Sequence, residues 1–93
     1  MTLLPAEAGK RVRFEFSAEP GSRVFVAGTF NDWCPTANPL KGKPGGQQFQ
    51  AALRVPTGTH EYKFVVNGVW AMDPKCVEWT PNGQGSLNSV LRV

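Results

Sequence analysis

The chain has 93 residues, of which 41% are apolar, and its formal net charge is +3. This length fits one domain, since domains usually run to roughly 100–150 residues. Ten glycines and eight prolines are scattered through the sequence, so little room remains for helices of the usual ~11–12 residues. The composition therefore predicts an all-β domain.

The same numbers argue against several classes of protein. No apolar run reaches the roughly 20 residues that a membrane helix needs and no signal peptide is visible, so we expect a cytoplasmic protein without membrane contact. The two cysteines, Cys34 and Cys76, are too few for a disulfide framework, and a reduced pair is favoured over a single bridge. One histidine and scattered acidic residues indicate neither a metal site nor a cofactor. Basic residues spread along the sequence argue against nucleic acid as a partner.

The first half of the chain contains two predicted strands and a long connection. Residues 1–10 show no clear pattern and are expected to lead into a domain spanning residues 11–93. Residues 11–18 alternate between apolar and polar side chains, which is typical of a half-buried strand. Residues 23–28 form a denser apolar run and predict a more central strand. Residues 35–46 hold three prolines and three glycines, so we expect a polar connection without regular structure.

The second half of the chain is organised around a predicted hairpin. Residues 48–55 alternate again and predict another strand. Asn67-Gly68, the strongest short hairpin signal in a sequence, then separates two strands at 60–66 and 69–72. Residues 75–86 are expected to form a loop, and a last strand follows from Leu87 to the end of the chain. Short strands separated by regular turns predict a β-sandwich of immunoglobulin type.

A two-residue turn also fixes which residues of the hairpin face each other. The expected pairs are Val66 with Val69, Val65 with Trp70, Phe64 with Ala71, and Lys63 with Met72. Directly opposed residues share a face, so one face is expected to be core and the other to be turned outward. The core face holds Tyr62, Phe64, Val66, Val69 and Ala71. The outer face holds Glu61, Lys63, Val65, Trp70 and Met72, with Lys63 close to Trp70.

Catalysis finds little support in the sequence, and we predict that the protein is not an enzyme. Cys34 and His60 are formally a nucleophile and a base, but nothing brings them together. His60 is expected to open a strand at the surface. Asp32 and Asp73 are interpreted as turn caps, because a sandwich of this size leaves little volume for a cleft between paired carboxylates.

The tryptophans give a stronger indication of function. Trp33 and Trp79 fall in predicted loops, and Trp70 falls on the polar-leaning face of the hairpin. Exposed apolar surface of this kind usually marks a contact site. An aromatic ring flanked by hydrogen-bonding side chains suits a sugar ring, which has an apolar C–H face and a rim of hydroxyls. The alternative is that one or more of these rings cover an edge of the core.

Four segments together resemble a known family: residues 24–33, 60–70, 73–74 and 85–93. They are similar to family 48 carbohydrate-binding modules, and most of all to the glycogen-binding domain of the AMP-activated protein kinase β subunit. The resemblance implies an early-set immunoglobulin-like sandwich of six to eight short antiparallel strands. It also implies non-catalytic binding of α-1,4-glucans (glycogen, starch, maltooligosaccharides) and targeting of a glycogen-metabolising enzyme or kinase subunit to glycogen.

The resemblance also implies which residues touch the sugar. The family's two stacking tryptophans correspond to Trp33 and Trp70, and its hydrogen-bonding lysine corresponds to Lys63. The polar pair of its last loop falls on Ser86 and Asn88. In kinase-type members a leucine side chain inserts into the curl of the glucan, and at that position this chain has Gln84. That departure favours the alternative function, a protein-interaction module of the same fold with weak or lost sugar binding.

Overall fold

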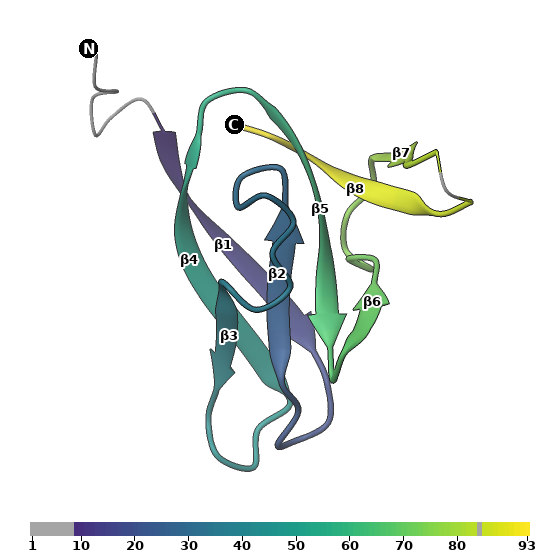
Figure 1. Cartoon of the computed structure of the whole chain (residues 1–93). Helices are drawn as coiled ribbons and strands as arrows, with labels where there is room; N and C mark the ends of the chain where they lie inside the picture. Colours follow the sequence, from purple (N-terminus) through teal and green to yellow (C-terminus); the bar gives the residue numbers. More distant parts are fainter. Residues whose placement is uncertain (1–8, 84) are drawn as a thin grey trace.

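The computed structural model describes residues 9–83 and 85–93, and all regular structure in this part of the chain is β-strand (Figure 1). Every strand pair is antiparallel. The strands are β1 (Gly9–Ser17), β2 (Val24–Gly28), β3 (Pro39–Gly42), β4 (Gln48–Pro56), β5 (Thr59–Val66), β6 (Val69–Ala71), β7 (Trp79–Pro81) and β8 (Leu87–Arg92). The predicted all-β class is confirmed.

The strands form two layers that are joined by hydrogen bonds. The path runs β1-β4-β3-β2-β5-β8-β7, and β6 pairs with β5. β3 pairs with both β2 and β4, so the sheet curls over and β1 and β4 run obliquely across β2 and β5 (Figure 1). Phe14 on β1 faces the other layer, where its ring centroid lies 5.3 Å from that of Tyr62 and 6.4 Å from that of Phe64. The result is a β-sandwich.

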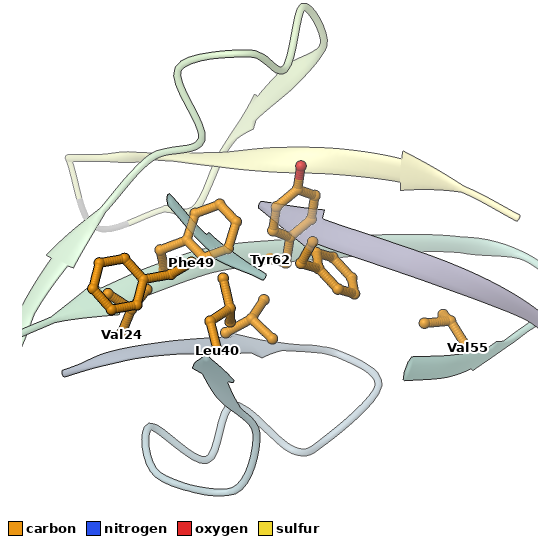
Figure 2. Packing of buried hydrophobic residues seen from close by; sticks show 8 residues of the cluster. Val24, Leu40, Phe49, Val55 and Tyr62 are labelled. Atoms are coloured by element: carbon orange, nitrogen blue, oxygen red, sulfur yellow. The ribbon is translucent and has the colours of Figure 1, made fainter. Parts of the chain in front are cut away.

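The core lies between these two layers, and Figure 2 shows side chains of both layers meeting there. Because successive residues of a strand point to opposite faces, the strands β1 to β5 contribute side chains to it from one face each. On β1, for example, Phe14 is buried whereas its neighbour Arg13 is exposed. The core residues are Phe14, Val24, Val26, Leu40, Phe49, Val55, Tyr62 and Phe64.

The predicted hairpin is confirmed with three of its four predicted pairs; β6 ends at Ala71, so the fourth pair, Lys63 with Met72, is not part of the ladder. Asn67 and Gly68 have φ angles of 51° and 83°, the positive values that both central residues of a type I′ turn require. The observed pairs are Val66 with Val69, Val65 with Trp70, and Phe64 with Ala71. The turn sequence alone therefore sets which residues of β5 and β6 share a face.

Three predictions about burial in this hairpin are wrong. Val69, expected in the core, is 66% exposed, because β6 lies at the sheet edge and pairs with β5 alone in the described part of the chain. Lys63 and Val65, expected to be turned outward, are only 8% and 4% exposed. Their strand, β5, lies between β2 and β8, so side chains of neighbouring strands cover them. Register assigns a face but not how well that face is covered.

Two segments predicted as loops contain short strands. The connection 35–46 includes β3, whose Leu40 is 5% exposed and lies opposite Val24 on β2. Pro39 occupies the first position of this strand, where a missing N–H is tolerated. The segment 75–86 includes β7, which pairs with β8. Strands of four and three residues are too short to show a recognisable alternation.

The cysteines are both free thiols, as favoured from the sequence. The Sγ of Cys76 lies 3.2 Å from the carbonyl oxygen of Glu78 and 3.5 Å from that of Val90, and donates to them. Within residues 9–83 and 85–93, no helix is long and apolar enough to cross a bilayer.

Replacing Phe64 by alanine should cost about 3–5 kcal/mol of unfolding free energy, because the buried ring packs against Phe14, Phe16 and Tyr62 and leaves a cavity. Val69→Ala is the matched control and should change stability by less than about 0.5 kcal/mol, since this side chain is exposed. Urea denaturation of the three proteins measures both values. Equal losses for the two variants would contradict the observed difference in burial.

Candidate functional site

A groove of about 790 Å³ lies on the outer face of the layer formed by β2, β5, β8 and β7. Its volume is within the range of small-ligand sites, roughly 300–1,000 Å³. It is lined by Thr29, Trp33, Glu61, Lys63, Trp70, Pro81, Asn82, Ser86 and Asn88. Five of the six residues assigned to sugar binding from the sequence therefore lie in one groove. The sixth, Gln84, lies outside the described residues, and the roles of all six stay predictions.

Lys63 lies in this groove and holds its charge in a fixed position. Its side chain leaves the outer face of β5, and its aliphatic stem is covered while the ammonium group remains at the groove. The Nζ atom donates a hydrogen bond of 2.5 Å to Oγ of Ser86. Ser86 is held in turn by Asn82, whose Oδ1 accepts the Ser86 N–H at 3.2 Å. The ammonium group is therefore anchored to the loop between β7 and β8.

A second polar pair lies on the same face of the sheet. Asn88 on β8 is 6% exposed, and its Nδ2 donates to Oε1 of Glu61 on β5 at 2.9 Å. Together with Lys63 and Ser86, this pair gives the groove an ammonium, a hydroxyl, an amide and a carboxylate. These four groups form the polar wall of the groove, which offers both hydrogen-bond donors and acceptors to a ligand.

Two tryptophans form the apolar part of the groove. The ring centroids of Trp33 and Trp70 lie 6.4 Å apart, and their planes meet at 51°. Trp70 is 46% exposed and pairs across the hairpin with Val65, which itself lies opposite Phe25. The two rings therefore present an angled apolar surface beside the polar wall.

The loop that carries Trp33 is fixed by one asparagine. Oδ1 of Asn31 accepts the Gly28 N–H at 2.9 Å, and its Nδ2 donates to the carbonyl of Val26 at 3.0 Å and to Oδ1 of Asn38 at 2.7 Å. Asp32 and Trp33 both have φ of 57°, a left-handed conformation that costs roughly 1–2 kcal/mol for each non-glycine residue. The hydrogen bonds of Asn31 offset this cost and so hold Trp33 in place.

Gly28 explains why this loop can leave β2 so close to the groove. A Cβ atom at this position would lie 2.4 Å from the carbonyl oxygen of Glu61 and 2.9 Å from Cβ of Tyr62. Only a glycine permits this approach of the two strands. Its carbonyl also accepts the Trp33 N–H at 2.9 Å.

His60 does not line the groove but contacts Thr29, which does. Its Nε2 lies 2.8 Å from the carbonyl oxygen of Pro56, which can only accept, so Nε2 carries the proton in this bond. In the neutral ring, Nδ1 then accepts from the hydroxyl of Thr29 at 3.0 Å. The same hydroxyl accepts the Glu61 N–H at 3.2 Å. Both ring nitrogens are thus committed to structural hydrogen bonds.

The sequence did not indicate every groove residue. The alternation of β5 places Glu61 on the same face as Lys63, but it did not suggest a role in the site. Thr29 and Asn82 lie one residue beyond a strand end and Pro81 is the last residue of the short strand β7, so none of them carries a periodic signal. Trp79, a weaker candidate from the sequence, is 55% exposed on β7 but does not line the groove.

The groups considered for catalysis have other roles. Hydrogen bonding to Thr36 lowers the pKa of the Cys34 thiol, which is therefore engaged away from His60. Asp73 caps a turn as predicted, since its Oδ1 accepts the Lys75 N–H at 2.9 Å. Its Oδ2 accepts a 2.6 Å hydrogen bond from the hydroxyl of Tyr62. No cluster of three or more metal-ligating side chains occurs among the described residues.

Asn31→Ala should destabilise the protein by about 1–3 kcal/mol, because it leaves buried polar groups of the loop without their partner. It should also weaken the near-ultraviolet circular dichroism that arises from the Trp33–Trp70 pair, since Trp33 loses its fixed position. Thermal unfolding and the near-ultraviolet spectrum measure the two effects. A variant with full stability and an unchanged spectrum would show that Asn31 does not position the loop.

The stability of the protein should fall at high pH through Tyr62. Burial raises the pKa of this phenol, and the hydrogen bond to the Asp73 carboxylate raises it further. The neutral form is therefore favoured in the folded state, so its contribution is complete below the ordinary tyrosine pKa of about 10 and is lost above it, by up to ~1.4 kcal/mol per pH unit. Because Tyr62 is the single tyrosine, tyrosinate absorbance reports its titration directly. The Tyr62→Phe variant should show a flatter alkaline profile, and an identical profile would contradict the assignment.

Known proteins resemble this chain over most of its length. A family model described as the glycogen recognition site of AMP-activated protein kinase matches residues 10–93. The chain is 34% identical over 90 residues to 5'-AMP-activated protein kinase subunit beta-2 of Mus musculus, which covers 96% of this chain and 31% of that protein. It is 36% identical over 77 residues to subunit beta-2 of Homo sapiens, covering 82% of this chain and 26% of that protein.

A beta-1 subunit gives a similar result. The chain is 35% identical over 74 residues to 5'-AMP-activated protein kinase subunit beta-1 of Sus scrofa, which covers 78% of this chain and 56% of that protein. The chain thus spans only a part of each of these relatives. Since the family model matches nearly the whole chain, this protein belongs to the family of glycogen recognition domains of AMP-activated protein kinase.

Proposed function

We propose that this protein binds α-1,4-glucans such as glycogen, starch and maltooligosaccharides without cleaving them. The observation that carries the proposal is the angled pair Trp33 and Trp70 beside the polar wall of Lys63, Ser86 and Asn88 in one groove. Family membership supports the choice of glycogen as the natural polymer.

The angle between the two rings favours a curved glucan. Each ring covers the apolar C–H face of one sugar, and planes that meet at 51° follow a chain whose successive sugars turn. An α-1,4-linked chain curves in this way, whereas a β-1,4-linked chain runs straight and cannot follow both rings. The groove therefore selects the linkage by shape.

The polar wall supplies the hydrogen bonds. Sugar hydroxyls donate and accept, and the ammonium of Lys63 is a donor whereas the carboxylate of Glu61 is an acceptor. Because Ser86 and Asn88 already fix these two charges, little side-chain entropy is lost when a glucan binds. Gln84, the sixth residue assigned to sugar binding from the sequence, lies outside the described residues.

The binding module comprises residues 11–93 in this proposal, and residues 1–10 lead into it. The matched relatives are kinase subunits of which this chain spans only a part. A role in bringing an associated glycogen-metabolising enzyme or kinase subunit to glycogen in the cytoplasm follows from that likeness. It requires a second surface for the partner.

The competing function is a protein-interaction module with weak or lost sugar binding. Its support is a group of exposed apolar side chains outside the groove: Val77 at 90%, Trp79 at 55% and Leu87 at 38% exposure. Exposed apolar groups of this size often mark protein contacts. The two functions differ in what they predict for Trp70 and for Trp79.

Calorimetric titration with maltoheptaose should show binding, and cellohexaose should show none. Trp70→Ala should weaken maltoheptaose binding about five- to thirtyfold, which corresponds to a stacking contribution of ~1–2 kcal/mol. Trp79→Ala is the matched control, because it removes an equally exposed tryptophan outside the groove, and it should leave the affinity unchanged. Denaturation midpoints of the same samples show whether each variant is folded.

Equal responses to the α- and β-linked sugars would count against a site selected by curvature. Loss of binding in Trp79→Ala with full binding in Trp70→Ala would move the site to β7. Absence of any glucan binding by the folded protein would favour the protein-interaction module.

A further inference from the structure

Basic side chains that are scattered in the sequence gather on one face of the fold. This basic face is the outer side of β1, β4 and β3, opposite the groove. Six of the ten basic residues of the chain are on it, with Glu15 as their acidic neighbour: Arg11, Arg13, Lys41, Lys43, Arg54 and Lys75. They come from four separate parts of the chain, at 11–13, 41–43, 54 and 75, and folding brings them to one face.

Positive charge predominates on this face of the described chain. Arg11 lies directly opposite Arg54 across β1 and β4, and Nη1 of Arg54 donates to the carbonyl oxygen of Gly9 at 3.1 Å. Glu15 is shared between Arg13 at 3.5 Å and Lys75 at 3.7 Å. A surface of predominantly positive charge favours an anionic partner.

The same face ends at an open strand edge. β1 has nine residues and, within the described part of the chain, pairs with β4 alone. The Ala18 N–H donates to the carbonyl of Gln47, so Ala18 and every second residue before it direct their N–H and C=O groups toward β4. Since residues of an antiparallel pair alternate between bonded and non-bonded positions, the N–H and C=O groups of Arg11, Arg13 and Glu15 point away from β4. These are the residues whose side chains lie on the basic face.

The inner side of this edge is apolar and incompletely covered. Val12 and Phe16 on β1 point toward the core but are only partly buried. The edge of β1 thus alternates between basic side chains on the outer side and accessible apolar side chains on the inner side. A strand lying beside it would meet both in turn.

We propose that an extended acidic segment of a partner protein adds to the free edge of β1. Its alternate Asp or Glu side chains lie over Arg11 and Arg13, and its intervening apolar side chains cover Val12 and Phe16. Its backbone pairs with the outward N–H and C=O groups of β1, the mode by which peptides extend an exposed sheet edge. Because the basic face lies opposite the groove, a partner held there leaves the groove open.

The surface fits a protein segment better than a membrane or a nucleic acid. The large exposed apolar residues of the described chain are Val69, Trp70, Val77, Trp79 and Leu87. None of them lies on β1, β3 or β4, so these strands offer no large exposed apolar side chain for insertion into lipid or for stacking with bases. A row of backbone donors and acceptors is matched by another strand. Charge on an edge strand can also serve only to prevent aggregation, and the experiment distinguishes this case.

The test uses a fluorescein-labelled peptide of alternating Glu and Val with nine residues, the length of β1. Its control has the same composition with the glutamates grouped at one end. Fluorescence anisotropy should show binding of the alternating peptide to the whole protein, with an affinity that falls as salt is added. Hydrogen exchange should slow at the amides of Arg11, Arg13 and Glu15, and little elsewhere.

Three variants separate charge from backbone pairing. Arg13→Gln removes one charge and should weaken binding up to about fivefold. Arg13→Pro also removes an outward N–H, which an edge strand tolerates, and should weaken binding further. Arg23→Gln removes an exposed charge outside β1 and should have no effect. If Arg13→Pro does not fold, two other results decide. Weaker binding of Arg13→Gln tests the role of charge, and slower exchange of the β1 amides in the unchanged protein tests backbone pairing.

Three outcomes would overturn the proposal. Equal binding of the grouped peptide would show simple charge attraction without strand pairing. Displacement of the peptide by oligothymidine or by phosphatidylserine vesicles, with the same loss in Arg13→Gln, would assign the face to nucleic acid or to a membrane surface. No binding of the alternating peptide would leave the charges as a guard against edge-to-edge aggregation.

Discussion

The central constraint in this fold is that β5 is covered on both of its faces. β5 pairs with β2, β6 and β8, so it cannot shift in register without breaking three ladders. Its even-numbered residues Tyr62 and Phe64 complete the core, while Lys63 lines the groove and Val65 lies buried opposite Trp70. A shift of one residue would exchange these two sets. The position of the groove relative to the core is therefore fixed by the core itself.

That constraint was visible in the sequence because of one turn. Asn67-Gly68 fixes the pairing of β5 with β6, and the alternation of β5 then assigns each side chain to a face. The burial of Lys63 and the exposure of Val69 were not visible, because they depend on which strands flank β5 and β6. Strand order depends on contacts between residues far apart in the sequence. The strands β3 and β7 take part in that order, but they are too short to show an alternation in the sequence.

The groove was predictable only in part for a similar reason. Trp33 and Trp70 were recognisable because each departs from the pattern of a core tryptophan, and Lys63 followed from the hairpin register. The loop that holds Trp33 depends on Asn31, whose three hydrogen bonds join Gly28, Val26 and Asn38. The sequence predicted a loop at Trp33 and a turn cap at Asp32. It did not show that the strained conformation of Asp32 and Trp33 would be held by a single side chain.

The distribution of basic residues over the surface could not be predicted from their order in the sequence. In sequence order the basic residues are spread along the chain, which argued against nucleic acid as a partner. The antiparallel register of β1 with β4 then sets Arg11 against Arg54, and β3 adds Lys41 beside Gln50. Folding thus separates two surfaces by layer: the β2–β5–β8 layer carries aromatic rings and fixed polar groups, and the β1–β4 layer carries positive charge. Because the core fills the space between them, the proposed glucan and the proposed protein partner occupy separate surfaces of this small domain.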